Sequence, residues 1–405
     1  MQTLSAADAR RVLLGAAALG EPLGAGSAGV AALLDRLGAI QIDPIDRVGT
    51  NADLVAFARV DGLGRGDLYR HARGASFEHF AKERCLLHAR YFAHYRGRAV
   101  ETPWWRHSDR MKRIPGALLD DVRAEVHARG PVSAQELAPR GQTEAMDWSG
   151  WKGTSSLAAL AVEVLWTRCE VVASGRDARG RRLYAAPEAA LGAWATAPAV
   201  GEFGESMLLA RVRSAGLLAR AGGPTWSMLG ETRTDGTVDR LVEEGRLLAV
   251  RVGRRPYLML PDPPPPPADD GAVRILGPLD ALVWDRALVR EAFGFDYVWE
   301  IYKPAAERTW GYYVCPILAD GALVGRIEAR REGGTLMVER WWGAVDPTRL
   351  VASLERLATC NSCTELTTLP APSPPPSSTP GPSHTAPEGF VRASTSKDTS
   401  RDKSR

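Results

Sequence analysis

The sequence has little lysine, little cysteine and no long apolar run. Of its 51 basic residues only six are lysine, and the rest are arginine. Arginine suits bidentate phosphate contacts, but a GC-rich genome would produce the same bias, so this ratio decides nothing. The five cysteines are scattered and odd in number, which is typical of a reducing compartment and argues against a disulfide framework.

The sequence shows no pattern typical of a targeting signal or of a membrane-spanning segment. The start of the chain lacks a basic region followed by an apolar run, so no secretory signal is expected. No apolar stretch approaches the length that spans a membrane. We therefore expect a soluble, cytoplasmic protein that contacts no membrane.

Metal-binding patterns are incomplete. Cys360 and Cys363 have CxxC spacing, but no second pair follows that would complete a zinc site. Histidines and aromatic residues crowd residues 66–115, yet His88 and His94 are six residues apart, and no helical His-Glu motif links them. We expect aromatic packing around helices here, with some histidines at the surface, and neither a metal nor another cofactor.

Length and charge bound the architecture. A chain of 405 residues can bury a large core and suggests two or three domains. Its net charge is only +3. A nucleic-acid partner would therefore require the basic residues to gather on one face.

One short segment, Gln41-Ile42-Asp43-Pro44, stands out chemically. It follows a helix over residues 28–37 that ends at Gly38. In an extended backbone Gln41 and Asp43 would share one exposed face, with the neighbouring isoleucines pointing inward, and a residue before proline favours extended geometry. A carboxylate can stabilise developing positive charge or accept a proton from water, and an amide can orient that water. The same residues also suit an ordinary strand edge before a turn.

A helix–helix–hairpin order occurs twice in the middle of the chain. Helices followed by a two-stranded wing are typical of the winged helix-turn-helix, which commonly docks on duplex DNA. The first occurrence has helices at residues 117–129 and 156–166 and strands at 169–173 and 182–184, and the second has helices at 205–214 and 237–244 and strands at 246–252 and 257–260.

Basic residues on these wings are candidate phosphate contacts. They are Arg176, Arg179, Arg181, Arg251, Arg254 and Arg255. Trp151 and Lys152 precede the helix at residues 156–166, where backbone amides attract anions. Hairpin tips are polar in any soluble protein, however, and a tryptophan there also suits packing between domains.

The C-terminal third is expected to be a β domain. A stiff proline-rich linker at residues 261–267 precedes strands at 299–302, 311–318, 322–330 and 335–341, and a helix at 347–358. Asp280 and Asp285 are interpreted as structural. From about residue 360 the chain is rich in Pro, Ser and Thr, which predicts disorder.

Several of these segments together resemble the bacterial YcaQ/AlkZ-type DNA glycosylases, a winged-helix family that excises alkylated bases and unhooks interstrand crosslinks. The resemblance covers about residues 5–357. It rests on Gln41-Ile42-Asp43, which matches the family's Gln-apolar-Asp pair, and on residues 77–80, 148–152, 274–285 and 293–297. Where the family leads us to expect histidine, this chain has Asn51-Ala52-Asp53.

The resemblance implies an α+β fold of tandem winged-helix units and a C-terminal antiparallel β domain. The expected divisions are residues 1–115, 116–200, 201–262 and 263–359 and a disordered tail at 360–405. The implied activity is base-excision DNA repair on duplex DNA by a nucleoid-associated monomer, with Gln41 and Asp43 catalytic and no cofactor.

The expected enzyme is a monofunctional glycosylase that hydrolyses the N-glycosidic bond of N-alkylated purines. No lysine lies near the motif along the sequence, which disfavours a lyase that forms a Schiff base. A non-catalytic winged-helix DNA-binding regulator remains an alternative, because fold does not settle function. A paralogue with a different lesion preference is another.

Overall fold

Three small sheets repeat one strand order in the computed structural model, which describes residues 1–98, 112–144 and 153–375. In each, a hairpin is joined by a short strand that pairs antiparallel with the hairpin's second strand. The sheets are β2(Ala39–Gln41)-β4(Glu83–His88)-β3(Ser76–Ala81), β5(Val132–Ser133)-β9(Arg182–Ala185)-β8(Val172–Arg176), and β10(Leu218–Ala219)-β12(Arg255–Met259)-β11(Leu248–Val252).

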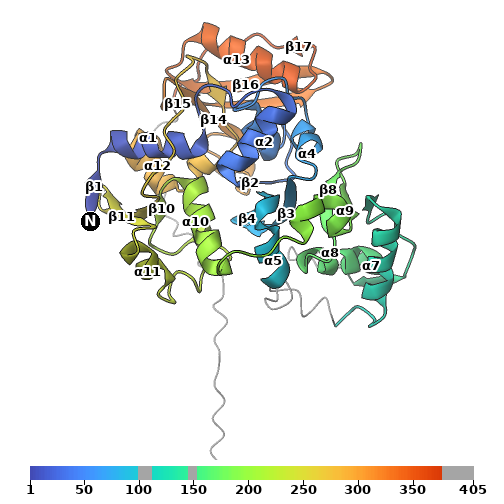
Figure 1. Cartoon of the computed structure of the whole chain (residues 1–405). Coiled ribbons are helices and arrows are strands. Elements are labelled where there is room, and N and C mark those ends of the chain that lie inside the picture. Colours follow the sequence, from blue (N-terminus) through green and yellow to red (C-terminus); the bar gives the residue numbers. More distant parts are fainter. Residues whose placement is uncertain (99–111, 145–152, 376–405) are drawn as a thin grey trace, which may run out of the picture. The chain divides into compact units, whose positions relative to one another are not determined.

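Helices precede and separate the strands of each sheet (Figure 1). Those of the first 200 residues are α1(Ala6–Ala17), α2(Gly26–Leu37), α3(Asn51–Phe57), α4(Asp67–His71), α5(Phe92–Arg98), α7(Leu118–Arg129), α8(Leu157–Thr167) and α9(Pro187–Leu191). Those that follow are α10(Phe203–Ala215), α11(Thr237–Glu243), α12(Arg286–Phe293) and α13(Pro347–Cys360). The mixed α+β class expected from the sequence is confirmed.

The two hairpins predicted in the middle of the chain are confirmed, with β8 paired to β9 and β11 paired to β12. The sequence did not reveal β1(Gln2–Leu4), which extends the third sheet by pairing parallel with β11. A three-residue strand carries too little periodicity to be recognised alone.

The prediction for residues 66–115 is wrong over its central part. Residues 76–88 form the β3–β4 hairpin, where packing around helices was expected. Phe77 meets Phe92 edge to face, with ring centroids 5.2 Å apart. His79 is buried rather than at the surface, and its Nε2 lies 3.1 Å from the carbonyl oxygen of Thr167.

The C-terminal third contains a five-stranded sheet, and the helix predicted to close this part of the chain is confirmed as α13. The strand order is β13(Arg274–Ile275)-β14(Val314–Ala319)-β15(Ala322–Glu332)-β16(Thr335–Gly343)-β17(Glu365–Leu366). All pairings are antiparallel except β16–β17. The strand expected at residues 299–302 is absent from this described segment, which forms a loop and a turn.

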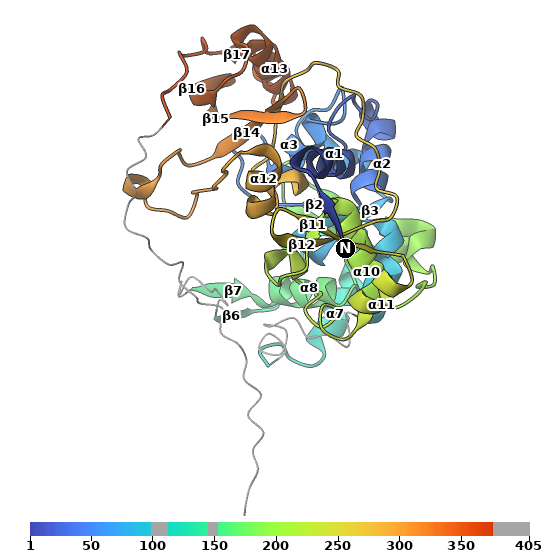
Figure 2. The same ribbon diagram turned by 90° about the vertical axis from the view of Figure 1, so that its left-hand side faces the viewer.

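The proline-rich linker is extended but it is not a free spacer. It lies against α1 and α2 and can be followed beside them in Figure 2. Arg36 Nη2 donates to the carbonyl oxygen of Pro265 at 2.8 Å. At Gly15, inside α1, a Cβ atom would lie 2.0 Å from the carbonyl oxygen of Pro264. Only glycine therefore allows the linker to approach this helix so closely.

The tail boundary expected at residue 360 also needs correction. Beyond α13, β17 joins the sheet, and Leu366 and Leu369 pack against its hydrophobic core. Trp341 Nε1 donates to the carbonyl oxygen of Pro370 at 2.7 Å, and the Ser373 amide donates to the carbonyl oxygen of Trp341 at 2.8 Å. A few apolar residues and backbone pairing thus anchor a segment whose composition indicated disorder. Residues 376–405 lie outside the described residues.

A buried ion pair ties the first helices to the C-terminal third. Arg59 Nη1 and Nη2 donate to the two carboxylate oxygens of Asp280 at 2.8 and 2.9 Å, and both side chains are 0% exposed. Arg59 also donates to the carbonyl oxygens of Ala17 and Val55. Asp280 accepts from the Leu282 amide. The structural role predicted for Asp280 is thereby confirmed.

Asp280→Ala is expected to lower the free energy of unfolding by about 3–5 kcal/mol, because it leaves Arg59 as a buried, unpaired cation. Urea denaturation measures the change. The matched control is Asp296→Ala, which removes an aspartate from an arginine pair in which both side chains are 61% exposed and should change the midpoint little. Equal losses in the two variants would contradict the role given to Arg59–Asp280.

Truncation after Asn361 is expected to lower the free energy of unfolding by at least about 2 kcal/mol, since it removes β17 and several hydrogen bonds to β16. Truncation after residue 375 serves as the control and should leave the melting temperature unchanged, because half of the removed residues are Pro, Ser or Thr and few are large and apolar. Thermal unfolding of the two shortened chains measures the difference. Identical melting temperatures would show that residues 362–375 contribute no stability.

Candidate functional site

The Gln41-Ile42-Asp43 segment straddles the end of a strand. Gln41 is the last residue of β2, pairs with Cys85 of β4 and is 6% exposed. Asp43 lies beyond the strand and is half-buried. The expectation of a polar, exposed face is therefore wrong for Gln41, which is buried together with Ile40. Strand alternation stops at Gln41, so it no longer governs where Asp43 points.

Asp43 lies in a loop, one residue before a bend at Pro44. Its Oδ1 accepts a hydrogen bond from the Ile45 amide at 2.9 Å. Burial raises the pKa of the Asp43 carboxyl above its ordinary value of 3.8, and the Ile45 hydrogen bond opposes that shift. Asp43 forms no ion pair with any residue in the described ranges.

Asp46, three residues on, has the opposite environment. Burial raises its pKa, but the hydrogen bond and charge of Arg65, with Arg331 nearby, leave the pKa lowered overall. Two neighbouring carboxyls whose pKa values are pushed apart are typical of sites that divide acid and base roles. Asp43, without an arginine, is the carboxyl of the two that is available to a substrate.

Lys82 joins this site from the β3–β4 hairpin, although it is 41 residues from Gln41 along the chain. Its Nζ donates to Gln41 Oε1 at 2.9 Å and lies 5.3 Å from the ring centroid of Trp284. The side chain is buried at 8% exposure, and burial lowers the lysine pKa to about 8. The sequence argument that no lysine lies near the motif is thus wrong in space. The sequence analysis missed this residue, and the scarcity of lysine is the one signal that could have pointed to it.

The hydrogen bonds of Gln41 fix the orientation of its side-chain amide. Because Oε1 accepts from Lys82, the Nε2 amide group is the end left to donate to a substrate or a water. The Gln41 carbonyl oxygen accepts from Asn51 Nδ2 at 2.8 Å. Asn51 Oδ1 in turn accepts from the Leu279 amide at 2.9 Å. Asn51, fully buried where histidine was expected, therefore holds β2 against the C-terminal third.

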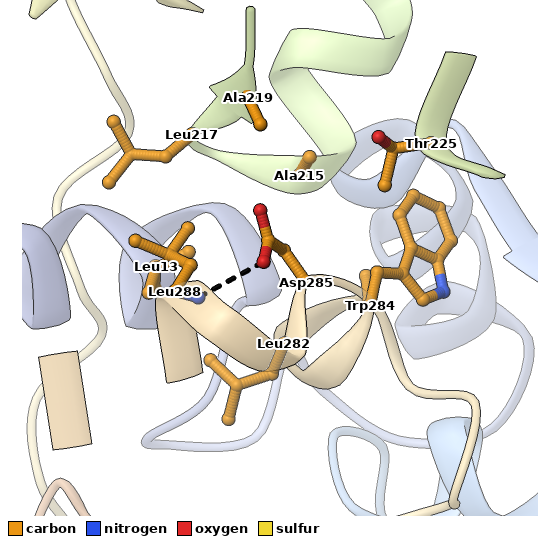
Figure 3. A pocket seen from close by; sticks show the side chains of 10 residues that line it. Leu13, Ala215, Leu217, Ala219, Thr225, Leu282, Trp284, Asp285 and Leu288 are labelled. Atoms are coloured by element: carbon orange, nitrogen blue, oxygen red, sulfur yellow. Dashed lines mark hydrogen bonds between the residues drawn. The ribbon is translucent and has the colours of Figure 1, made fainter. Parts of the chain in front are cut away.

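A small, mainly apolar pocket lies behind Trp284 and is separate from these polar groups. Figure 3 shows Trp284 at one end and Asp285 beside α12, with Asp285 accepting from the Leu288 amide at 3.0 Å. Its remaining lining is Leu13, Ala215, Leu217, Ala219, Thr225, Ala281, Leu282 and Leu288. Asp285 caps α12, which confirms its predicted structural role.

The basic residues predicted on the second wing lie in different environments. Arg176 is turned toward the body, where it pairs with Glu78 and lies 4.4 Å from the centroid of the Tyr69 ring. Arg181 Nε donates to Asp177 at 2.6 Å. Arg179 is exposed. Of these three predicted contacts, Arg179 is the one left accessible to a partner.

The β11–β12 hairpin, predicted as the third wing, is more open. Arg251, Arg254 and Arg255 are all exposed on the β11–β12 hairpin, and none forms an ion pair with a residue that the structure describes. Trp151 and Lys152, the remaining predicted contacts, lie outside the described residues.

Two broader features bear on the type of site. In residues 1–98, 112–144 and 153–375, no group of three or more His, Cys, Asp or Glu residues is arranged to hold a metal ion. Within the same ranges, no helix combines the length and apolar character that crossing a membrane requires. The candidate site comprises Gln41, Asp43 and Lys82, with Lys82 joined to Gln41 by a hydrogen bond.

Comparisons with known proteins agree on one family. The family model described as "DNA glycosylase AlkZ-like" matches residues 34–360, most of the chain and all of this candidate site. Among solved structures, the DNA glycosylase AlkZ of Streptomyces sahachiroi is similar in fold, with a TM-score of 0.56 and 16% sequence identity over 90% of this chain and 100% of that one. The resemblance read from the sequence is thereby confirmed, and the chain belongs to the AlkZ-like DNA glycosylase family.

Proposed function

We propose that this protein excises N-alkylated purines from duplex DNA, and unhooks interstrand crosslinks, by hydrolysing the N-glycosidic bond. The observation that carries the proposal is Gln41, whose amide nitrogen donates to no residue in the described ranges, two residues before Asp43, a half-buried carboxyl that forms no ion pair within those ranges. The alkylpurine and crosslink assignments come from the family resemblance. The site supports the chemistry that both substrates share.

The chemistry follows from the charges involved. An alkylated purine is already a cationic leaving group, so the site needs little acid catalysis at the base. What must be stabilised is an oxocarbenium-like sugar, together with a water that attacks C1′. Gln41 Nε2 would donate to the oxygen of that water, and the Asp43 carboxylate would accept its proton and face the developing positive charge.

Release of the base by water is the monofunctional reaction, and it is the one proposed for excision. It uses Asp43 and Gln41 and forms no covalent intermediate. It leaves a sugar without its base in an otherwise intact strand.

The three repeated sheets support a tandem winged-helix interpretation. Each unit has a helix, a short strand, further helices and a hairpin, which is the order of a winged helix. We propose that the exposed arginines of the third wing, with Arg179, contact phosphates of the duplex. Trp151 and Lys152 remain proposed contacts on sequence grounds. The protein is proposed to act as a monomer.

Asp43→Asn is expected to lower single-turnover excision of N7-methylguanine from duplex DNA by at least ~10²-fold, because it removes the proposed general base and its negative charge. Affinity for the duplex should be preserved, because Asp43 is not a proposed DNA contact. Asp35→Asn makes the same chemical change at an exposed carboxylate and should leave excision unaffected. Excision by Asp43→Asn at the parent rate would overturn the mechanism. DNA binding without excision by the parent protein would instead favour the regulator.

The pH dependence of excision provides a second readout of Asp43. Because burial raises its pKa, the carboxyl becomes protonated at a higher pH than an ordinary aspartate does. The excision rate should therefore fall as the pH drops through that raised pKa, at a higher pH than for an ordinary aspartate. In Asp43→Asn the residual rate should lose this acid limb. An unchanged acid limb in the variant would assign the titration to another group.

DNA affinity should depend on salt despite the small net charge. If about five phosphates are neutralised, a log–log plot of affinity against salt should have a slope of about −4 to −5. Arg254→Ala together with Arg255→Ala should make this slope shallower by about two. Arg70→Ala, at an exposed arginine of α4, is the control and should leave the slope unchanged. A flat salt response of the parent protein would argue against the wing assignment.

A further inference from the structure

Lys82 occupies an unusual position for a lysine. It is the residue between β3 and β4, and Glu83 beside it has a φ of 58°, which closes the turn tightly. The side chain folds inward, so that Nζ reaches Gln41 Oε1 and the face of the Trp284 ring. Lysines at hairpin turns normally extend into water. This one is held inside the candidate site by an amide and an aromatic ring.

The charge of Lys82 is poorly compensated there. Within the described residues, no Asp or Glu lies within ion-pair distance of Nζ. Glu83 and Cys85 favour the charged form from the same hairpin, while Arg211 of α10 and Arg286 of α12 disfavour it. Burial is the largest effect, and it lowers the pKa to about 8. A substantial fraction of the amine is therefore neutral at physiological pH, which is the nucleophilic form.

The hydrogen bond to Gln41 relates the Lys82 amine to the proposed excision geometry. If Gln41 Nε2 holds the attacking water, a group on Gln41 Oε1 lies on the order of 5 Å from that water, given ordinary hydrogen-bond lengths. The four-carbon stem of lysine can cover the remaining distance to C1′ by rotation. Lys303, by contrast, lies at the surface and pairs with Glu300.

We propose that Lys82 gives this glycosylase a second activity, cleavage of the DNA strand at the abasic site through a Schiff base. The proposal rests on the excision function inferred above, because the substrate is the product of excision. The ring-opened abasic sugar carries an aldehyde at C1′. The chemical class of the ligand is thus a sugar aldehyde within duplex DNA.

The reaction balances with groups already present. The Lys82 amine adds to the C1′ aldehyde, and loss of water, carrying the aldehyde oxygen, forms an imine that is protonated on nitrogen. A base, a role assigned here to Asp43, removes a proton from C2′. The electron pair forms the C2′–C3′ double bond, and the C3′–O bond breaks with release of the phosphate. Water then hydrolyses the imine, freeing an unsaturated aldehyde and restoring the lysine.

The test uses the full-length chain and a duplex with one abasic site made by a different glycosylase. In the presence of sodium borohydride, the imine should be reduced to a stable protein–DNA adduct. Without it, the strand should be cut on the 3′ side of the abasic site. Mass spectrometry of the digested adduct should place the reduced sugar on the peptide that contains Lys82. This readout needs no variant, so it does not depend on how a substitution folds.

Variants provide the second readout. Lys82→Arg retains a cation that can donate to Gln41 Oε1 but cannot form an imine, and it should reduce adduct formation to the level seen without borohydride. Lys303→Arg is the matched control and should trap at the parent level. Adduct formation by the parent should rise with pH and be half-maximal near 8, because the neutral amine reacts.

The outcomes separate this proposal from the excision function. The abasic duplex is supplied ready-made, so a protein unable to excise a base could still form the adduct, and an efficient glycosylase could fail to. Absence of an adduct with the parent protein overturns the lyase proposal and leaves monofunctional excision. An adduct mapped to another amine, or an undiminished adduct with Lys82→Arg, also overturns it.

Discussion

The buried contact between Arg59 and Asp280 is the constraint on which the site depends. Both side chains are fully removed from water, and such a pair is tolerable only when hydrogen bonds satisfy its remaining groups. Arg59 achieves this by also donating to carbonyl oxygens of α1 and α3. Asp280 lies four residues before Trp284, so this pair fixes the segment that faces Lys82. The pair thereby holds the N-terminal helices against the C-terminal third.

Asn51 extends the same constraint to the motif itself. It binds the Gln41 carbonyl oxygen on one side and the Leu279 amide on the other, so β2 and the C-terminal segment are joined by one amide. A Cβ atom on Gly277 would lie 2.3 Å from Asn51 Oδ1, which explains the glycine at that approach. Gln41, Lys82 and Trp284 thus meet only in the folded chain. The site is a product of tertiary structure more than of the motif.

This origin explains what the sequence could and could not predict. Local signals sufficed where one segment decided the outcome: Gly38 ends α2, and both central hairpins lie where the sequence predicted them. Gln41 and Asp43 could be selected from the sequence because an amide and a carboxylate two residues apart suggest catalytic chemistry. Lys82 could not be, because its importance comes from a turn that packs 41 residues from its partner. The arginines of the predicted wings could be selected from the sequence as candidate phosphate contacts. The ion pair that turns Arg176 inward could not be foreseen, because it too is a tertiary contact.

The two titrating groups of the site have a joint consequence for its chemistry. In the proposed excision Asp43 acts as the carboxylate, and burial raises its pKa. Burial lowers the pKa of Lys82, so that this amine has its transition near 8. Strand cleavage requires Lys82 to be neutral, so it is favoured toward that transition and above it. Below the transition, the charged lysine would keep its hydrogen bond to Gln41 and support the amide that holds the water. The same side chain would then position Gln41 when protonated and attack the sugar when neutral, so local pH would set how often excision is followed by strand cleavage.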